Sequence, residues 1–347
     1  MLGGKFEVCG VLGEGATGIV YDAHPLGKPD EERVALKVIH RHLLGDPQVR
    51  GRFTREVAIL RRLQGEHLCP ILDFGELVDP RSSDNLLYMT IPKVPGFSLE
   101  RLMATEGPLS ADRVVDIVLQ ICSALTDAHR QGVIHRDLKP ANVLLRDGDY
   151  AFVVDFGMAK IVTGAGGTGT TELTTHNMVF GTPEYMAPEQ ARGDEPDARC
   201  DVYAVGVILY ELLAGKVPFR GASPLNVLTA HMTEAPPPLS RPPSEVAPAL
   251  EAVVYSALAK SPDERYASAS DLARALEHAR LAPNDVDAVS PRLPESNTVP
   301  LPTTRSPAPG DMPRDTPRWG GARWIVVWLL AVSVGIGIGV WLSLHTR

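Results

Sequence analysis

A short polar stretch, His135-Arg136-Asp137-Leu138-Lys139-Pro140-Ala141-Asn142, gathers a carboxylate, two cations and an amide between apolar segments. A phosphoryl group in transfer spreads negative charge over its oxygens, so a protein that catalyses this reaction mainly positions a hydroxyl, neutralises charge and holds magnesium. Asp137 could accept the hydroxyl proton, Lys139 could place a positive charge beside the phosphate, and Asn142 could offer a neutral oxygen to a hard cation. The stretch predicts phosphoryl transfer; the alternative is a polar turn before a strand.

A second candidate carboxylate, Asp155, opens the tripeptide Asp155-Phe156-Gly157 directly after the strand-like residues 151–154. Glycine permits a sharp change of chain direction there, and the carboxylate would suit magnesium. The same tripeptide also occurs as Asp73-Phe74-Gly75, among earlier strand-like residues. We interpret that copy as a turn.

Glycines recur in Gly13-Glu14-Gly15-Ala16-Thr17-Gly18, where the lack of a Cβ lets backbone approach phosphates. A dinucleotide-binding motif would require a helix that opens at the third glycine. The residues that follow, Ile19-Val20-Tyr21, instead favour a second strand and therefore a hairpin.

Lys37 ends an apolar, strand-like run, where an ammonium needs an anionic partner. Residues 49–63 have apolar side chains at helical spacing, and Glu56 in this helix could turn toward Lys37. The alternative for Glu56 is a solvated helix face, since several arginines lie nearby in the sequence.

The elements that must position these groups fall into two sets. Strand-like runs at 71–77 and 86–91 follow the hairpin, and Pro92-Lys93-Val94-Pro95-Gly96 breaks regular structure. Helices are then predicted to residue 280, including a helix over 201–213 that is apolar nearly all round and therefore buried. The chain is predicted to form two lobes joined at residues 92–96.

Taken together, these motifs resemble the protein-kinase family, and in detail the bacterial serine/threonine kinases that look like eukaryotic ones. The resemblance covers about residues 6–280 and includes Gly181-Thr182-Pro183-Glu184-Tyr185-Met186-Ala187-Pro188-Glu189. It implies an α+β bilobal kinase fold over 1–280, with a β-rich N-lobe (about 1–91), a hinge (92–96) and a mostly helical C-lobe (97–280).

The resemblance also implies the cofactors and their ligands. ATP and Mg²⁺, with Mn²⁺ as a possible substitute, are expected, with Asp137 as catalytic base beside Lys139 and with Asn142 and Asp155 as metal ligands. Lys37 would hold phosphates and pair with Glu56. Ile91 would guard the back of the adenine pocket, and the backbones of Pro92 and Val94 would meet the adenine edge. The expected ATP-binding residues are Leu12, Gly13, Glu14, Gly15, Ala16, Thr17, Gly18, Val20, Ala35, Lys37, Glu56, Ile91, Pro92, Val94 and Leu144.

Other roles follow from the same resemblance. Lys139 and Thr182 match kinases that act on Ser and Thr hydroxyls of proteins. Glu189 and Arg265 match a buried ion pair that braces the second lobe, and Asp201 is likewise assigned a structural role.

Residues 163–177 are rich in glycine and hydroxyls and poor in groups that pack, which is typical of a mobile loop. A phosphate added there could order the loop by pairing with Arg136. The alternative is a plain disordered loop. We expect phosphorylation by a second copy of the chain, at one of Thr168, Thr170, Thr171, Thr174 and Thr175.

Composition excludes other classes. The net charge of −8 and the lack of a basic stripe argue against nucleic-acid binding, and 44 % apolar residues are enough for a core. Four cysteines, at 9, 69, 122 and 200, lack zinc or disulfide spacing and are interpreted as small buried residues of a reducing compartment.

The C-terminal part has a different composition. Residues 281–323 are rich in proline and read as a tether, and residues 324–344 are uncharged and long enough to cross a bilayer. Arginines at 314, 318 and 323 favour a cytoplasmic kinase domain, a single pass through the cell membrane and an external tail at 345–347.

Two other functions compete with an active, membrane-anchored protein kinase. The chain could be a pseudokinase scaffold, but the sequence has every residue needed for turnover. It could also phosphorylate a small molecule, but the segment 181–189, in the family that it resembles, presents a protein hydroxyl.

Overall fold

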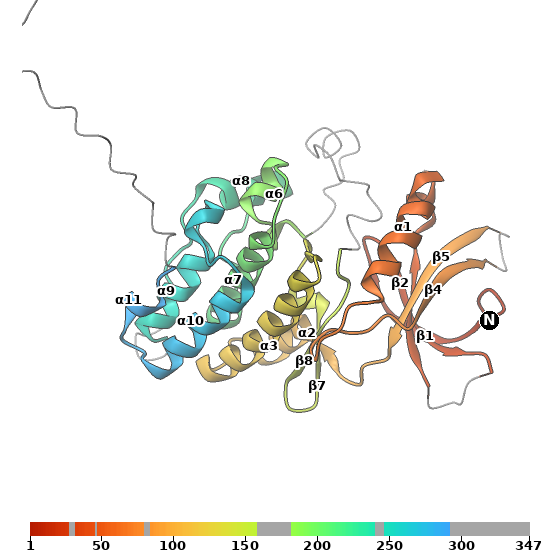
Figure 1. Cartoon of the computed structure of the whole chain (residues 1–347), viewed down its shortest axis with the longest axis horizontal. Helices are drawn as coiled ribbons and strands as arrows, with labels where there is room; N and C mark the ends of the chain where they lie inside the picture. The colour runs from red at the N-terminus through yellow and green to blue at the C-terminus, as the bar shows by residue number, and fades with distance from the viewer. Residues whose placement is uncertain (28–31, 46, 80–83, 158–181, 240–245, 292–347) are drawn as a thin grey trace, which may run out of the picture. The chain divides into compact units, whose positions relative to one another are not determined.

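The computed structural model describes residues 1–27, 32–45, 47–79, 84–157, 182–239 and 246–291, which Figure 1 shows in colour. All of them belong to one compact unit. Within it, strands build the N-terminal part and helices build most of the C-terminal part (Figure 1), so the predicted two-lobed α+β fold is confirmed.

The N-terminal lobe contains a five-stranded antiparallel sheet with the strand order β1-β2-β3-β5-β4. The predicted hairpin is present, because Gly15 pairs with Gly18 and only two residues connect β1 to β2. Gly18 has no room for a side chain: a Cβ would lie 2.2 Å from the carbonyl oxygen of Val38. The strands are β1 (Phe6–Gly15), β2 (Gly18–Pro25), β3 (Val34–Ile39), β4 (Asp73–Val78) and β5 (Asn85–Pro92).

The strand register aligns the predicted nucleotide-binding side chains. Val20 on β2 pairs with Lys37 on β3, and Ala35 on β3 pairs with Ile91 on β5. Directly paired residues and residues two apart share one face of a sheet. All four side chains therefore lie on the same face.

The first Asp-Phe-Gly copy, residues 73–75, is not the turn that we predicted. These residues open β4, where Asp73 pairs with Thr90 and Gly75 pairs with Tyr88. Tyr88 Oη donates a hydrogen bond to Asp73 Oδ2 at 2.7 Å. The prediction is wrong because Asp and Gly are weak strand formers by themselves, whereas pairing with β5 decides the structure here.

One helix, α1 (Pro47–Leu60), packs against this sheet (Figure 1). Its side chains at Val49, Phe53, Val57 and Leu60 are buried, which is the spacing of one helix face. The predicted helix over 49–63 is thus confirmed, with an end three residues earlier.

The C-terminal lobe is mainly helical, as predicted. Ser98 caps α2, since its Oγ accepts the backbone N–H of Arg101, and α7 is buried along almost its whole length. A small sheet, in the order β6-β7-β8, lies at the start of this lobe. The elements are β6 (Phe97–Ser98), α2 (Leu99–Glu106), α3 (Ala111–Arg130), β7 (Val143–Arg146), β8 (Tyr150–Val153), α6 (Pro188–Arg192), α7 (Arg199–Ala214), α8 (Pro224–Thr233), α9 (Pro248–Ala257), α10 (Ala269–Leu281) and α11 (Val286–Val289).

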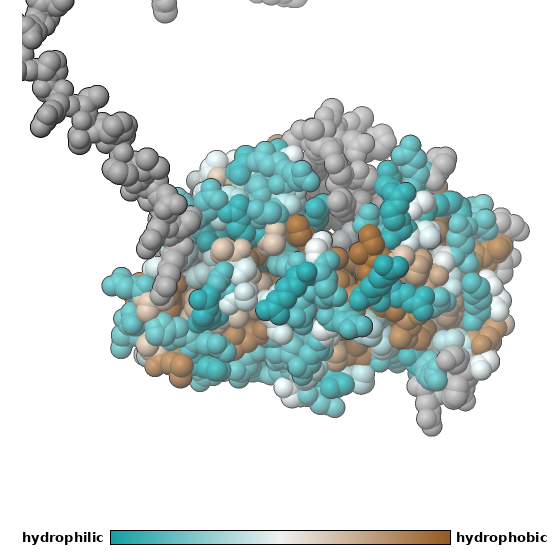
Figure 2. Space-filling model, in the orientation of Figure 1, coloured by the Kyte–Doolittle hydropathy of each residue, from teal (hydrophilic) through white to brown (hydrophobic). Residues whose placement is uncertain are grey.

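Two hydrophobic clusters stabilise the unit. The main cluster is continuous through both lobes, from Phe53 on α1 to the helices around α7. The smaller cluster belongs to the N-terminal sheet and includes Phe6, Leu36 and Tyr88. On the face shown in Figure 2, hydrophilic residues predominate and hydrophobic ones are scattered among them, as is usual for a folded surface.

The cysteines are only partly as predicted. Cys122 and Cys200 are buried, but Cys69 is half-buried and Cys9 is exposed on β1. Burial and the nearby charge of Asp155 raise the pKa of the Cys69 thiol to about 12. The thiol of Cys69 therefore stays protonated at neutral pH.

The predicted tether and membrane span, 281–323 and 324–344, lie almost entirely outside the described residues. Only the start of the tether is described, where α10 ends and α11 follows. Among the described residues, no helix combines the length and the apolar character that a bilayer crossing needs.

Candidate active site

The polar stretch at 135–142 is fixed by a buried carboxylate from another element. Asp201, in the first turn of α7, accepts the backbone N–H groups of His135 at 2.8 Å and of Arg136 at 2.9 Å. It also accepts Nε2 of His129 at 2.8 Å. Arg136 has a positive φ of 66°, which is rare for a residue with a side chain. Asp201 therefore holds the backbone turn that precedes Asp137.

Asp201 should make stability depend on pH. Burial by itself raises the pKa of Asp201, but the hydrogen bond from His129 and contacts with His135 outweigh it, so the pKa lies below 3.8. A lowered folded-state pKa means that the carboxylate stabilises the fold above pH 3.8 and that this contribution is lost as pH falls through the folded-state pKa.

We expect Asp201→Asn to lower the free energy of unfolding by about 2–3 kcal/mol at pH 7. The gap between the variant and wild type should narrow below pH 3.8. Urea titrations of both proteins at a series of pH values measure this gap. A gap that stays constant down to the lowest pH at which both fold would contradict the assignment.

Asp137 and its neighbours form one connected group. Asn142, in a 3-10 helix (Pro140–Asn142), donates Nδ2 to the backbone oxygen of Asp137 at 2.8 Å. Nζ of Lys139 lies 3.3 Å from Oδ2 of Asp137 and donates to Oγ1 of Thr182 at 3.0 Å. Four of the predicted site residues thus lie together, and Lys139 connects the carboxylate of Asp137 to the predicted substrate segment.

Lys37 has a partner other than the one we predicted. Its Nζ lies 2.6 Å from Oδ2 of Asp155, and their side chains are 10 % and 24 % exposed. Among the described residues, no ion pair joins Lys37 to Glu56, which is half-buried on α1. The expected Lys37–Glu56 pair is therefore not formed in this structure, because the closer carboxylate of Asp155 satisfies the ammonium.

The predicted metal ligands Asn142 and Asp155 can offer an amide oxygen and a carboxylate. Asn142 uses its amide nitrogen for Asp137, which turns the amide oxygen of Asn142 toward other partners. Asp155 has a positive φ of 64°, and the following Gly157 donates its N–H to the oxygen of His135 at 3.1 Å. One carboxylate and one amide oxygen fit magnesium, which keeps waters and phosphate oxygens as its other ligands.

His135 connects this turn to Asp155. Its Nε2 lies 2.9 Å from the backbone oxygen of Val154, and its ring centroid is 4.6 Å from that of Phe156. Both rings are buried. The strand that precedes Asp155 and the turn that precedes Asp137 are therefore held in one fixed arrangement.

The predicted ATP-binding residues come from both lobes. Val20, Ala35 and Ile91 are half-buried on the sheet face that carries Lys37, and Leu144 is half-buried on β7. Leu12 lies within β1 and is 50 % exposed. Their roles in nucleotide binding stay a prediction.

The hinge has an anchor that the sequence analysis missed. Pro92 ends β5 opposite Val34, and the N–H of Lys93 donates to the oxygen of Arg33 at 3.2 Å. The Lys93 side chain pairs with Asp22 on β2. A signal was available, because Asp22 stands between Tyr21 and Ala23 within a strand, where a carboxylate needs partners.

Glu189 and Arg265 are joined as predicted. Two parallel contacts of 2.7 Å connect the guanidinium to the carboxylate, and the side chains are 0 % and 6 % exposed. Gln190, the next residue, donates to the oxygen of Arg136 at 2.8 Å, a contact the sequence analysis missed. The ion pair and the turn before Asp137 are thus connected through α6.

The predicted phosphorylation sites at 168, 170, 171, 174 and 175 lie outside the described residues. The Arg136 side chain is half-buried. Its pairing with a phosphate stays a prediction.

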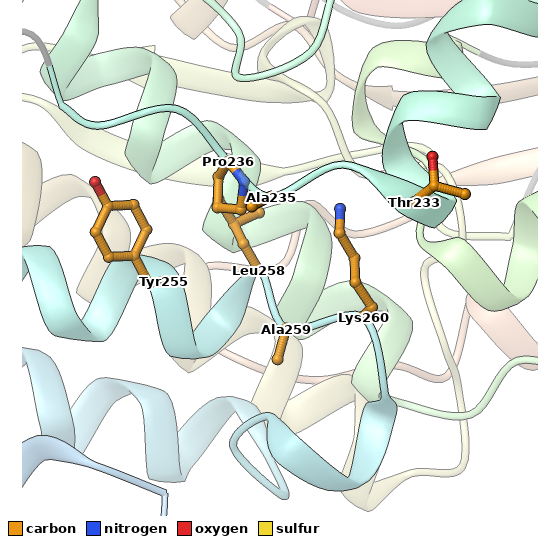
Figure 3. A pocket seen from close by; sticks show the side chains of 7 residues that line it. All are labelled: Thr233, Ala235, Pro236, Tyr255, Leu258, Ala259 and Lys260. Carbon is orange, nitrogen blue, oxygen red and sulfur yellow. The ribbon is translucent and has the colours of Figure 1, made fainter.

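A separate pocket of about 480 Å³ lies in the C-terminal lobe, between the end of α8 and the end of α9 (Figure 3). Lys260 and Tyr255 extend beside it, and burial together with the charge of Arg265 lowers the pKa of Lys260 to about 8. None of the predicted site residues lines it. We therefore assign this pocket no part in phosphoryl transfer.

Comparison with known proteins agrees with this geometry. Residues 6–279 match the family described as protein kinase domain. The chain is 40 % identical over 330 residues to serine/threonine-protein kinase pkn3 of Myxococcus xanthus, covering 91 % of this chain and 58 % of that protein. It is 36 % identical to serine/threonine-protein kinase PknB of Mycolicibacterium smegmatis, covering 96 % and 53 %. It thus spans about half the length of these curated relatives.

A solved structure, the Mycobacterium tuberculosis PknI kinase domain, aligns with a TM-score of 0.59 at 28 % sequence identity and covers 79 % of this chain and 95 % of that one. The same two-lobed arrangement is therefore found in an experimentally determined kinase domain. Because the family match extends over most of the sequence and over both lobes, the chain belongs to the protein kinase domain family.

Proposed function

We propose that the chain is a serine/threonine protein kinase that transfers the γ-phosphate of ATP to Ser or Thr hydroxyls of proteins. The observation that carries this proposal is the cluster of Lys37, Asp137, Lys139, Asn142 and Asp155, which come from three separate segments of the sequence and are brought together by the fold. Phosphoryl transfer needs this set: a base, two cations and two oxygen ligands for a metal.

The proposed mechanism assigns each group one task. Asp137 orients the attacking hydroxyl and accepts its proton, and Lys139 stabilises the charge that develops on the transferred phosphate. Magnesium, when bound, neutralises phosphate charge and orients the nucleotide. Lys37 must exchange Asp155 for phosphate oxygens, which frees the Asp155 carboxylate for the metal and Lys37 to approach Glu56.

The choice of Ser and Thr over Tyr is supported by the Lys139–Thr182 hydrogen bond of 3.0 Å. This contact places a cation between the catalytic carboxylate and the segment that would present the acceptor. The named function of the relatives, serine/threonine-protein kinase, points the same way.

The proposal also covers how the kinase is regulated and where it is located in the cell. We infer phosphorylation of a threonine within 168–175 by a second copy of the chain, with Arg136 as the cation that receives the phosphate. We also infer anchoring in the cell membrane through 324–344, with residues 1–280 as the kinase domain on the cytoplasmic side and 345–347 outside. Sequence composition alone supports the membrane anchor and the orientation.

The test is incorporation of labelled phosphate from ATP and magnesium into the full-length chain and into an unrelated protein acceptor. Asp137→Asn is expected to lower the rate at least about a hundredfold, because the hydroxyl loses its base. Mass spectrometry should place the label on serine or threonine, and on 168–175 in the chain itself. If wild type binds ATP yet labels neither itself nor the acceptor, a scaffold function replaces the proposed enzyme.

A further inference from the structure

An ion-pair cluster lies beside the hinge, where the buried carboxylate of Asp22 on β2 contacts Arg33, just before β3, and Lys93. Oδ2 of Asp22 lies 2.8 Å from Nζ of Lys93, and Oδ1 accepts Nε of Arg33 at 2.9 Å. A second Arg33 contact, from Nη2 to Oδ2 of Asp22, completes a two-pronged pair. One carboxylate thus connects two cations from different segments.

The cluster lies next to the predicted ATP-binding residues in the sheet. Asp22 pairs with Ala35, and Ala35 pairs with Ile91, so the three residues form one row across β2, β3 and β5. Paired residues share a face, and this face carries Lys37. Asp22 therefore lies in the same row as the predicted ATP-binding residues Ala35 and Ile91, on the hinge side of the row that contains Lys37.

Lys93 lies between the two residues whose backbones are predicted to meet adenine, Pro92 and Val94. Regular pairing ends with β5 at Pro92, and β6 begins only at Phe97. The backbone of Lys93 is tied to Arg33, and its side chain is tied to Asp22. These two contacts hold the hinge backbone at Lys93 against β2 and the start of β3.

The carboxylate of Asp22 is more buried than the two cations that it contacts. The Asp22 side chain is only 11 % exposed, against 32 % for Lys93 and 40 % for Arg33. Burial alone raises the pKa of Asp22, but the hydrogen bonds and charges of Lys93 and Arg33 lower it below 3.8. Removing the carboxylate would leave two neighbouring cations that repel each other.

We propose that Asp22 is a positioning residue for nucleotide binding, which acts through Lys93 to hold the Pro92 and Val94 backbone groups in the geometry that adenine requires. Holding a binding segment in its bound conformation lowers the entropy that binding must overcome. The assignment rests on the proposed function, because it presumes that ATP binds at this face. It predicts weaker nucleotide binding, with little change in the chemical step, when the link is broken.

The experiment uses the full-length chain and four variants. Calorimetry measures the Kd for ATP, and phosphate transfer to the acceptor protein gives the KM for ATP and kcat. Asp22→Asn and Lys93→Met are each expected to raise Kd and KM about three- to tenfold and to change kcat less than about twofold. Lys93→Arg keeps the charge and should bind nearly as wild type does. Arg33→Met leaves the Asp22–Lys93 pair in place and should have the smallest effect of the three charge-removing changes.

A double variant and a matched control make the result specific. Asp22→Asn combined with Lys93→Met should bind no more weakly than the worse single variant, because both changes break the same link. Asp149→Asn removes a comparable carboxylate, paired with Arg113 Nε at 2.6 Å in the C-terminal lobe, and should leave ATP Kd unchanged. Asparagine tolerates the positive φ of 61° at position 149.

Two results would overturn the assignment. The first is an unchanged ATP Kd in Lys93→Met, a change at a partly exposed side chain that should fold even if Asp22→Asn does not. The second is a fall in kcat without a rise in KM. A wild-type chain that binds no ATP would instead refute the proposed function, so failures of the two proposals are distinguishable.

Discussion

Asp155→Asn is expected to lower the rate of phosphoryl transfer about 10³-fold or more, since a metal ligand contributes several kcal/mol of charge stabilisation in such a site. The change keeps the shape of the side chain and removes its charge. Lys37 would also lose the carboxylate that lies 2.6 Å from its Nζ. The measurement is the initial rate of labelled-phosphate transfer at saturating ATP and magnesium.

The chain supplies its own matched control for this change. Asp73 stands in an identical Asp-Phe-Gly tripeptide, but it lies in β4 and accepts a hydrogen bond from Tyr88. Asp73→Asn retains an acceptor for that bond, so transfer should stay within about twofold of wild type. Equal losses in both variants would show that the assay reports folding, and the metal-ligand role of Asp155 would then have no support.

Glu189→Gln is expected to lower the free energy of unfolding by about 3–5 kcal/mol, because removal of one partner leaves a buried charge uncompensated. Arg265 uses its whole guanidinium: besides Glu189, it donates to the backbone oxygens of Ala259, Arg199 and Lys260. Its side chain is fully buried. Denaturant unfolding at pH 7, followed by far-ultraviolet circular dichroism, measures the loss.

An exposed ion pair nearby provides the comparison. Asp263 pairs with Arg199 at 2.6 Å, but the Asp263 side chain is 83 % exposed. Exposed pairs contribute little, so Asp263→Asn should unfold at nearly the wild-type denaturant concentration. If Glu189→Gln were as mild as Asp263→Asn, the buried pair would not brace the lobe.

Local sequence signals predicted most of the elements, because their physical causes are local. Three glycines followed by β-branched residues indicated the hairpin at 13–20, and the nearly all-apolar run over 201–213 indicated the buried helix α7. Apolar spacing indicated α1. Lys37 could be proposed as a site residue because an ammonium at the end of an apolar strand needs an anionic partner, and Asp137, Lys139 and Asn142 because they share one short polar stretch.

The pairing of those residues was harder to predict, because it depends on distances across the fold. Lys37 had several carboxylates within possible reach, and only the placement of α1 and of residue 155 selects Asp155 over Glu56. The two Asp-Phe-Gly copies are chemically identical and differ in their neighbours alone. Asp22 went unnoticed because its partner Lys93 is 71 residues away.

The continuous main cluster has a consequence for synthesis on the ribosome. Apolar residues of the N-terminal lobe, such as Phe53 and Leu87, belong to a core that the later helices complete. Lys37 and Asp155 are 118 residues apart, a length that takes roughly 6–24 s to translate at the usual rate. During that interval the later helices have not yet covered the apolar face of the first lobe, so this lobe completes its core only after residue 155 and the helices beyond it have been synthesised.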